Sequence, residues 1–148
     1  MTYEETLHYL YTSIPVFQHS GASAYKPGLG TSIALDDYLG NPHKAYKTIH
    51  VAGTNGKGSV SHLLAAILRQ SGFKVGLYTS PHLVDFRERI RVNGKKISQD
   101  YVVDFVERHR SFFEPLHPSF FELTSSMAFE YFRDQQVDYA VIEVGLGG

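Results

Sequence analysis

The spacing of apolar residues divides the chain into segments that favour helices and segments that favour strands. Apolar residues recur three and four positions apart in residues 58–71, 100–113 and 120–131, which predicts three amphipathic helices. Apolar and β-branched runs in residues 46–53, 74–80 and 137–145 predict strands, and the last run is apolar enough to be a buried parallel strand. This order of elements is typical of an α/β domain in which helices flank a parallel sheet.

The first forty residues predict two further helices. Thr2 and Glu5 have the spacing of a capping box, so we expect a short helix that begins there and stops before Pro15, because the residue that precedes a proline avoids the α region. Residues 18–32 are rich in Gly and Ser and predict a loop. A short helix should follow and end at Gly40.

Turn signals mark the boundaries in the second half of the chain. Gly72 stands where a helix would end in a left-handed cap, and Asn93-Gly94 between alternating segments predicts a β-hairpin. The sequence ends at "EVGLGG", directly after the last predicted strand. We therefore expect that strand to lie at the edge of an incomplete sheet, with the 148 residues forming the N-terminal part of a larger domain.

Composition excludes several classes of protein. The 148 residues are 43% hydrophobic and 20% charged, with a net charge of -1, so we expect no broad nucleic-acid surface. The absence of cysteine excludes disulfides, thiolate metal sites and a cysteine nucleophile. No apolar run reaches the length of a membrane span, and the acidic N-terminus does not resemble a signal peptide. We expect a cytoplasmic protein without a membrane partner.

One local cluster of charge departs from this balance. Five basic residues lie close together in the sequence, interrupted by Asp85 and Glu88; they are Arg87, Arg89, Arg91, Lys95 and Lys96. The cluster is interpreted either as a solvated face or as a rim that attracts anions.

The strongest chemical signal is the stretch "VAGTNGKGSVSHLL", residues 51–64. The usual Walker A pattern requires Ser or Thr directly after the lysine, whereas here Gly58 separates Lys57 from Ser59. The physical requirements of a phosphate loop are nevertheless met, because glycines, a lysine and a hydroxyl stand between a strand and a helix N-terminus. A plain glycine-rich turn would explain one or two of these glycines, but not the whole run.

Glu143 is the second candidate. It lies near the C-terminal end of the apolar run 137–145, and ligands of open α/β sheets bind at the carboxyl ends of strands. An acid there is placed to hold Mg²⁺, whereas the alternative is a glutamate that faces solvent at a strand end. An unpaired carboxylate inside the sheet would be costly, so a metal or a cationic partner is expected.

Four motifs occur together and in order: "HVAGTNGKGS", "GLYTSPHLVDFRERIRVNGKKIS", "FFELTSSMAF" and "VDYAVIEVGLGG". With them the chain resembles the folylpolyglutamate synthase/dihydrofolate synthase family of the Mur ligase superfamily, from about Thr2 to the last residue. The resemblance implies a P-loop-containing parallel sheet flanked by helices. It also implies an ATP-dependent ligase that adds L-glutamate to dihydropteroate or folate through an acyl phosphate, with ATP and Mg²⁺ required.

The resemblance also implies roles for single residues. The ATP phosphates would be held by seven consecutive residues, among which Lys57 would stabilise the transferring γ-phosphoryl group; they are Gly53, Thr54, Asn55, Gly56, Lys57, Gly58 and Ser59. Mg²⁺ would be held by Ser59, Ser80 and Glu143. The pterin site would be lined by Pro81, His82, Phe121, Glu122, Leu123 and Thr124. Alternatively, Phe121 and Leu123 belong to a helix core and Glu122 faces solvent.

Two departures from the family limit the interpretation. The stretch "PGLGTSI", residues 27–33, lacks a Glu-Arg pair that the family commonly has, which puts a substrate contact from this loop in doubt. The family also continues beyond "EVGLGG" with further metal-site residues and a C-terminal domain, so the 148 residues alone are expected to be inactive. A Mur-type cell-wall ligase and a nucleotide-binding module without catalysis remain alternatives. The oligomeric state stays open, although the full-length parent is expected to be a monomer.

Overall fold

The structure is a computed structural model, and it describes residues 1–20, 30–53, 56–80, 82 and 84–143. Its helices are α1 (Tyr3–Ser20), α2 (Gly30–Leu39), α3 (Lys57–Gln70), α4 (Gln99–Phe113) and α5 (Phe120–Asp134), and its strands are β1 (Lys47–Val51), β2 (Val75–Tyr78), β3 (Ile90–Val92), β4 (Lys95–Lys96) and β5 (Tyr139–Glu143). The chain divides into two compact units: Met1–Asn41 with Gln99–Met127, and Pro42–Ser98 with Ala128–Gly148. Helix α5 begins in the first unit and ends in the second.

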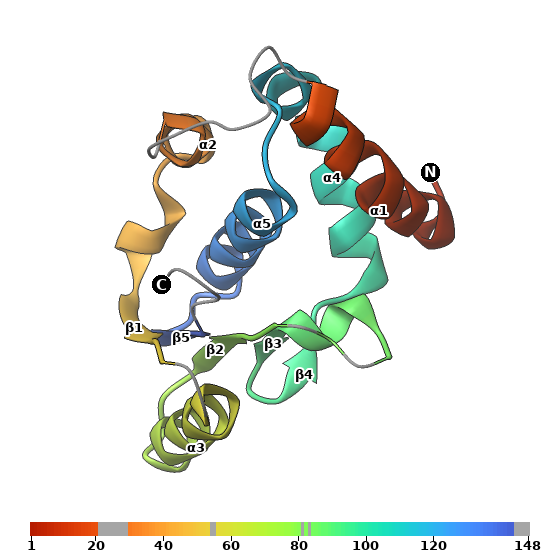
Figure 1. The fold of residues 1–148 in the computed structure, drawn as a ribbon. Helices are drawn as coiled ribbons and strands as arrows, with labels where there is room; N and C mark the ends of the chain where they lie inside the picture. Colours follow the sequence, from red (N-terminus) through yellow and green to blue (C-terminus); the bar gives the residue numbers. More distant parts are fainter. Residues whose placement is uncertain (21–29, 54–55, 81, 83, 144–148) are drawn as a thin grey trace. The chain divides into compact units, whose positions relative to one another are not determined.

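The first unit is helical, and α1 lies alongside α4 in it (Figure 1). The predicted capping box is confirmed, because Thr2 N donates to Glu5 Oε1 at 2.8 Å and Glu5 N donates to Thr2 Oγ1 at 3.1 Å. Helix α2 packs on α4 through Tyr38, whose ring stacks on Phe112 with centroids 3.9 Å apart. The helices are thus held together mainly by apolar and aromatic contacts.

The predicted end of the first helix is wrong. Helix α1 does not stop before Pro15 but continues to Ser20. A proline inside a helix removes one backbone hydrogen bond and costs about 3 kcal/mol. Leu10 and Ile14, which are fully buried just before the proline, provide the tertiary packing that overrides this local preference.

The predicted loop 18–32 is shorter than expected. Helix α1 covers its first residues and α2 already begins at Gly30, while residues 21–29 lie outside the described residues. The end of α2 is confirmed, since Gly40 has a φ of 84°.

The second unit is built on a five-stranded sheet with the order β1-β5-β2-β3-β4, seen edge-on in Figure 1. Strands β1, β5 and β2 are parallel, and the hairpin β3–β4 continues the sheet in antiparallel direction. The hairpin turn is confirmed, because Asn93 (φ 49°) and Gly94 (φ 81°) both adopt the left-handed conformation of a type I′ turn. The fold class is thus α/β, as the sequence predicts.

Helices cover both faces of this sheet (Figure 1). On one face, α3 packs its partly buried apolar side chains on a cluster formed by Val51, Val75, Leu77 and Val141. On the other face, Phe132 of α5 lies against β2 at Gly76. The parallel strands therefore have the two-sided cover that their apolar sequences require.

The expectation that the last strand lies at an edge is wrong. Strand β5 pairs with β1 on one side and β2 on the other. Its residues Ala140, Val141 and Ile142 are buried, and a strand that is apolar on both faces gains most from an inner position.

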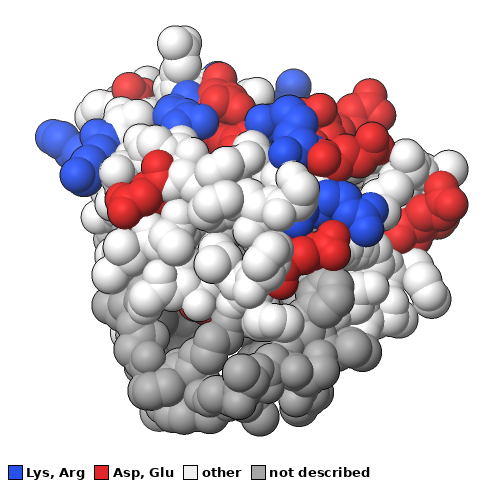
Figure 2. Space-filling model, turned by 90° about the horizontal axis from the view of Figure 1, so that it is seen from above, with Lys and Arg blue, Asp and Glu red and all other residues white. Residues whose placement is uncertain are grey.

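Charge on the surface is mixed. On the face shown in Figure 2, Lys and Arg side chains lie beside Asp and Glu side chains, in keeping with a net charge of -1. Among the described residues, no helix combines the length and the hydropathy needed to cross a membrane.

Candidate functional site

The register of the parallel strands brings the candidate residues of the second unit to the carboxyl ends of the strands, which we call the carboxyl edge of the sheet. Val51 at the end of β1 lies opposite Glu143 at the end of β5, and Tyr78 at the end of β2 lies opposite Ile142. Ser80 follows the end of β2 by two residues. Ligands of open α/β sheets bind at this carboxyl edge, so the fold places Ser80 and Glu143 at the expected end of their strands.

Helix α3 begins at the same edge. Its first residue is Lys57, and Gly56 caps it with a φ of 74°. Gly53 has a φ of 146°, and a Cβ atom on Gly53 or Gly56 would meet no atom within 4 Å. These two glycines are therefore required by backbone conformation, and the space above them is open. Thr54 and Asn55 lie outside the described residues.

The start of α3 can receive an anion. The first N–H groups of a helix lack partners within the helix, and the helix dipole makes this end positive. The side chain of Lys57, which is partly buried, adds a positive charge in the first turn, and Ser59 is exposed. A phosphate group at this position would be bound by the backbone, the lysine and the hydroxyl together.

Glu143 is the candidate metal ligand at the end of β5. Its side chain is only 3% exposed, and no hydrogen bond or ion pair joins its carboxylate to another described residue. Gly58 lies directly beside it, since a Cβ on Gly58 would be 3.6 Å from Oε2 of Glu143. A buried carboxylate that pairs with none of the described residues fits a site for a cation.

Phosphate groups of a nucleotide could complete a magnesium site at this end of the sheet. Within the described ranges, no three His, Cys, Asp or Glu side chains form a group that could hold a metal ion. Ser59, Ser80 and Glu143 offer two hydroxyls and one carboxylate, which are hard oxygen ligands of the kind that Mg²⁺ prefers. Mg²⁺ is commonly bound by one or two protein oxygens, substrate phosphates and water, so this donor set fits the ion.

His82 has a partner that the sequence analysis missed. Arg89 donates from Nε to His82 Nδ1 at 2.7 Å, and the ring of Phe86 packs edge-on to the imidazole. Burial first, and then the charge of Arg89, lower the pKa of His82 below its ordinary value, while Glu88 and Asp85 oppose the shift. Arg89 was assigned only to the basic cluster because its contact with His82 depends on the fold of the segment between them. Pro81 lies outside the described residues.

The remaining candidates, residues 121–124, lie in the first turns of α5 and belong to the first unit. Phe121 is 45% exposed, whereas Leu123 and Thr124 are fully buried. Glu122 caps its own helix, because its carboxylate accepts from Ser119 N at 2.9 Å and from Ser32 Oγ at 3.1 Å. Leu123 therefore belongs to the core and Phe121 does not.

The fold and the carboxyl-edge residues define a P-loop protein of the α/β class. A glycine-rich segment joins the parallel edge strand β1 to the N-terminus of α3, and the neighbouring strand β5 ends in an acid. The comparison with known proteins narrows this class to one family.

No family model matches the chain. The chain is 41% identical over 130 residues to the dihydrofolate synthase/folylpolyglutamate synthase of Bacillus subtilis, covering 83% of this chain and 30% of that protein. It is 48% identical to the crystal structure of folylpolyglutamate synthase from Thermotoga maritima, with a TM-score of 0.85 over 99% of this chain and 34% of that one. An FPGS structure in complex with AMPPCP and folate is 39% identical, with a TM-score of 0.85 over all of this chain and 36% of that one.

The chain belongs to the folylpolyglutamate synthase/dihydrofolate synthase family. It spans about a third of the length of these three proteins.

Proposed function

We propose that this chain is the ATP-binding part of an ATP-dependent ligase that joins L-glutamate to dihydropteroate or folate. The observation that carries the proposal is the buried carboxylate of Glu143 beside the N-terminus of α3. The FPGS structure solved with AMPPCP and folate supports it, because all of this chain matches a part of that protein. In this proposal residues 1–148 form the N-terminal part of a Mur-ligase-like ATP-binding domain.

The proposed reaction has two steps, and the residues at the carboxyl edge would act in the first. A carboxylate oxygen of the pteroate or folate attacks the γ-phosphorus of ATP, the bond to ADP breaks, and an acyl phosphate forms. The amine of glutamate then attacks the acyl carbon, phosphate leaves and an amide remains. Charge builds up on phosphate oxygens in the first step, so the α3 N-terminus and Lys57 would stabilise that transition state.

Mg²⁺ would neutralise phosphate charge when bound. Ser59, Ser80 and Glu143 would hold it at the carboxyl edge. The remaining residues of Gly53–Ser59 would cradle the phosphates through backbone N–H groups.

The substrate side of the proposal rests on two segments. Pro81 and His82 in the first segment, and Phe121 and Glu122 in the second, are the proposed pterin contacts. Leu123 and Thr124 are fully buried and would support the second segment from the core. Arg89 would hold the imidazole of His82 in one orientation through its hydrogen bond. We also propose a cytoplasmic location, which the cysteine-free composition supports.

Nucleotide titration tests the proposal. AMPPCP should bind the chain in the presence of Mg²⁺, and Lys57→Met should weaken binding at least tenfold, since it removes a charge-assisted contact worth about 1.5–3 kcal/mol. Lys47→Met is the matched control, because Lys47 begins β1 at the end of that strand opposite the phosphate loop. Equal binding by both variants would count against a phosphate site at α3.

Substrate class is tested separately by thermal shift with dihydropteroate and with UDP-muramoyl peptides. Stabilisation by the muramoyl peptides alone would replace the folate proposal with a cell-wall ligase.

A second candidate function is a nucleotide-binding module without catalysis, because the start of α3 and Glu143 account for nucleotide binding alone. Glutamate incorporation by the chain alone would exclude it.

A further inference from the structure

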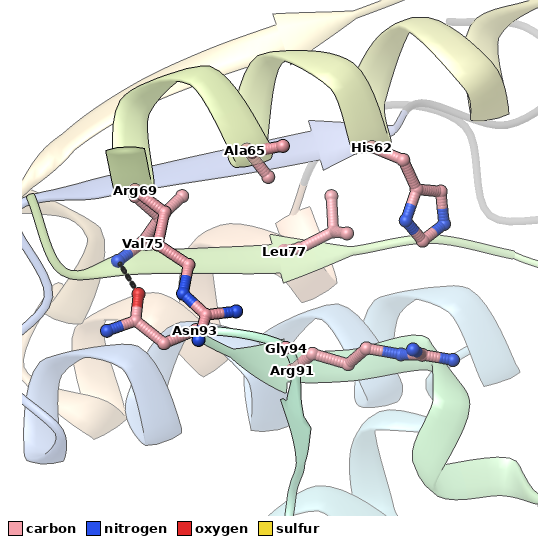
Figure 3. A pocket seen from close by; sticks show the side chains of 9 residues that line it. His62, Ala65, Arg69, Val75, Leu77, Arg91, Asn93 and Gly94 are labelled. Atoms are coloured by element: carbon pink, nitrogen blue, oxygen red, sulfur yellow. Dashed lines mark hydrogen bonds between the residues drawn. The ribbon is translucent and has the colours of Figure 1, made fainter. Parts of the chain in front are cut away.

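A groove runs between α3 and the strand pair β2–β3, on the face of the sheet that α3 covers (Figure 3). The helix contributes residues at positions 62, 65, 66 and 69, which share one side of α3. Val75 and Leu77 share one face of β2, and Arg91 and Asn93 continue that face on the neighbouring chain segment. The groove is therefore a regular product of helix and strand periodicity, with a volume of about 180 Å³.

The polar lining of the groove is basic. Arg69 reaches down from the last turn of α3 at one end, and the side chains of His62 and Arg91 lie toward the other end (Figure 3). None of the residues that line the groove is acidic. The floor is apolar, and an ionic contact is stronger over such a floor than in open water.

Arg69 and Arg91 differ from other arginines of the chain. Arg87, Arg108, Arg110 and Arg133 each lie within 4 Å of a carboxylate. Neither Arg69 nor Arg91 has such a partner among the described residues, and the hydrogen bond of Arg91 uses only its Nε, which donates to Glu88 O at 3.2 Å. Both guanidinium groups thus keep terminal N–H donors for a ligand.

The hairpin turn fixes one of these groups. A Cβ on Gly94 would lie 3.0 Å from Nη1 of Arg69, so the guanidinium packs directly on the turn. Asn93 in turn accepts a hydrogen bond from Val75 N through Oδ1 at 2.9 Å, which ties the turn to β2. Arg69 is held at the groove by a backbone that is itself anchored.

A second hollow of about 370 Å³ adjoins the groove and shares Arg69 and Asn93 with it. Lys74 and Lys95 add two more positive charges there, again without an acidic residue in the lining. The two hollows form a continuous basic zone around the hairpin turn.

We propose that this groove is an anion site separate from the phosphate loop, and that it takes a small organic or inorganic polyanion with at least two anionic groups. One group would pair with Arg69 and another with Arg91 and His62, because the guanidinium fork binds carboxylates and phosphates in a bidentate manner. The groove volume of about 180 Å³ leaves room for a ligand of this size. The proposal does not depend on the proposed ligase activity.

Two probes distinguish the sources of the charge: pyrophosphate for phosphate groups and tricarballylate for carboxylates. Each is titrated into the ¹⁵N-labelled chain carrying Lys57→Ala, which weakens binding at the phosphate loop, at constant ionic strength. We expect saturable shifts of the Nε–Hε signals of Arg69 and Arg91 and of the Gly94 amide. A response to one probe alone identifies the phosphate or the carboxylate class and still supports the site.

Variants locate the binding. Arg69→Gln and Arg91→Gln should each weaken binding about tenfold or more, whereas Arg108→Gln, which removes an arginine charge in the first unit, should not. Arg91→Lys, which keeps the charge and loses the fork, should bind more weakly than the parent. The absence of saturable shifts with both probes, or an equal loss in Arg108→Gln, overturns the proposal. Dispersed spectra of the variants show that they are folded.

Discussion

Gly58 lies against the buried carboxylate of Glu143: a Cβ on Gly58 would be 3.6 Å from Oε2 of Glu143. Gly58 is the residue that separates Lys57 from Ser59 and so breaks the usual Walker A pattern. Its position explains the departure in physical terms, because the first turn of α3 passes directly beside the proposed metal ligand.

Gly58→Ala is expected to raise the stability of the fold and to weaken ligand binding. A methyl group at 3.6 Å fits by ordinary contact, and alanine in a helix is more stable than glycine by roughly 0.5–1 kcal/mol. The same methyl would cover part of the Glu143 carboxylate, so Mg²⁺-dependent AMPPCP binding should fall about tenfold, the cost of one weakened charged contact. Thermal unfolding and calorimetric titration measure the two effects. Gly30→Ala in α2 is the control, and unchanged binding in Gly58→Ala would contradict the prediction.

Glu143→Gln tests whether Glu143 binds Mg²⁺. Without metal the variant should be more stable than the parent, by about 1–3 kcal/mol, because it replaces a buried carboxylate that pairs with none of the described residues. Added Mg²⁺ with AMPPCP should stabilise the parent, chelation by EDTA should reverse this, and the variant should respond to neither.

The control for this substitution is Glu130→Gln. Glu130 is equally buried, at 2% exposed, but it has interactions within the structure. It should therefore lose stability rather than gain it. A loss of stability in Glu143→Gln, similar to that of Glu130→Gln, would show that Glu143 has a structural partner.

The pair His82 and Arg89 gives a prediction about pH. The lowered pKa of His82 means that its neutral ring favours the folded state above the ordinary pKa of about 6.5, and that stability is lost as the pH falls below it. Arg89→Met removes the charge that lowers the pKa of His82 but leaves the imidazole buried. The pKa of His82 should therefore rise toward its ordinary value without reaching it, and the protein should lose less stability at acid pH. An NMR titration of the His82 ring measures this.

Arg87→Met serves as the control, since Arg87 pairs with Asp85 and makes no contact with His82 among those described. An unchanged His82 pKa in Arg89→Met would mean that the hydrogen bond is not formed in solution.

Local patterns were sufficient for most of the fold. Helical spacing, the Thr2–Glu5 capping box and the Asn93-Gly94 turn depend on residues close in sequence, and each was found where it was predicted. The order of strands was not predictable in this way. Strand β5 lies between β1 and β2 in the sheet although β3, β4, α4 and α5 separate it from β2 along the chain, and no local pattern encodes that pairing.

The same distinction between local patterns and long-range contacts applies to the site residues. Glu143 and the start of α3 were predictable, since a strand end and a helix start are local features. Arg89 and the groove at Arg69 and Arg91 were not, because their partners come from other segments. Within the basic cluster, Arg87 and Lys96 pair with Asp85, and Arg91 lines the groove.

Gly76→Ala should be far more damaging than Gly58→Ala, although both glycines lie in regular secondary structure. A Cβ on Gly76 would be 2.6–2.8 Å from three atoms of the Phe132 ring, and Phe132 is fully buried. Either the ring or β2 must move, which costs about 1–3 kcal/mol and lowers the midpoint of thermal unfolding. Phe132→Leu makes room for the methyl, so the double variant should lose less stability than the sum of the two single losses. Additive losses in this double-mutant cycle would show that Gly76 is required for another reason than the contact with Phe132.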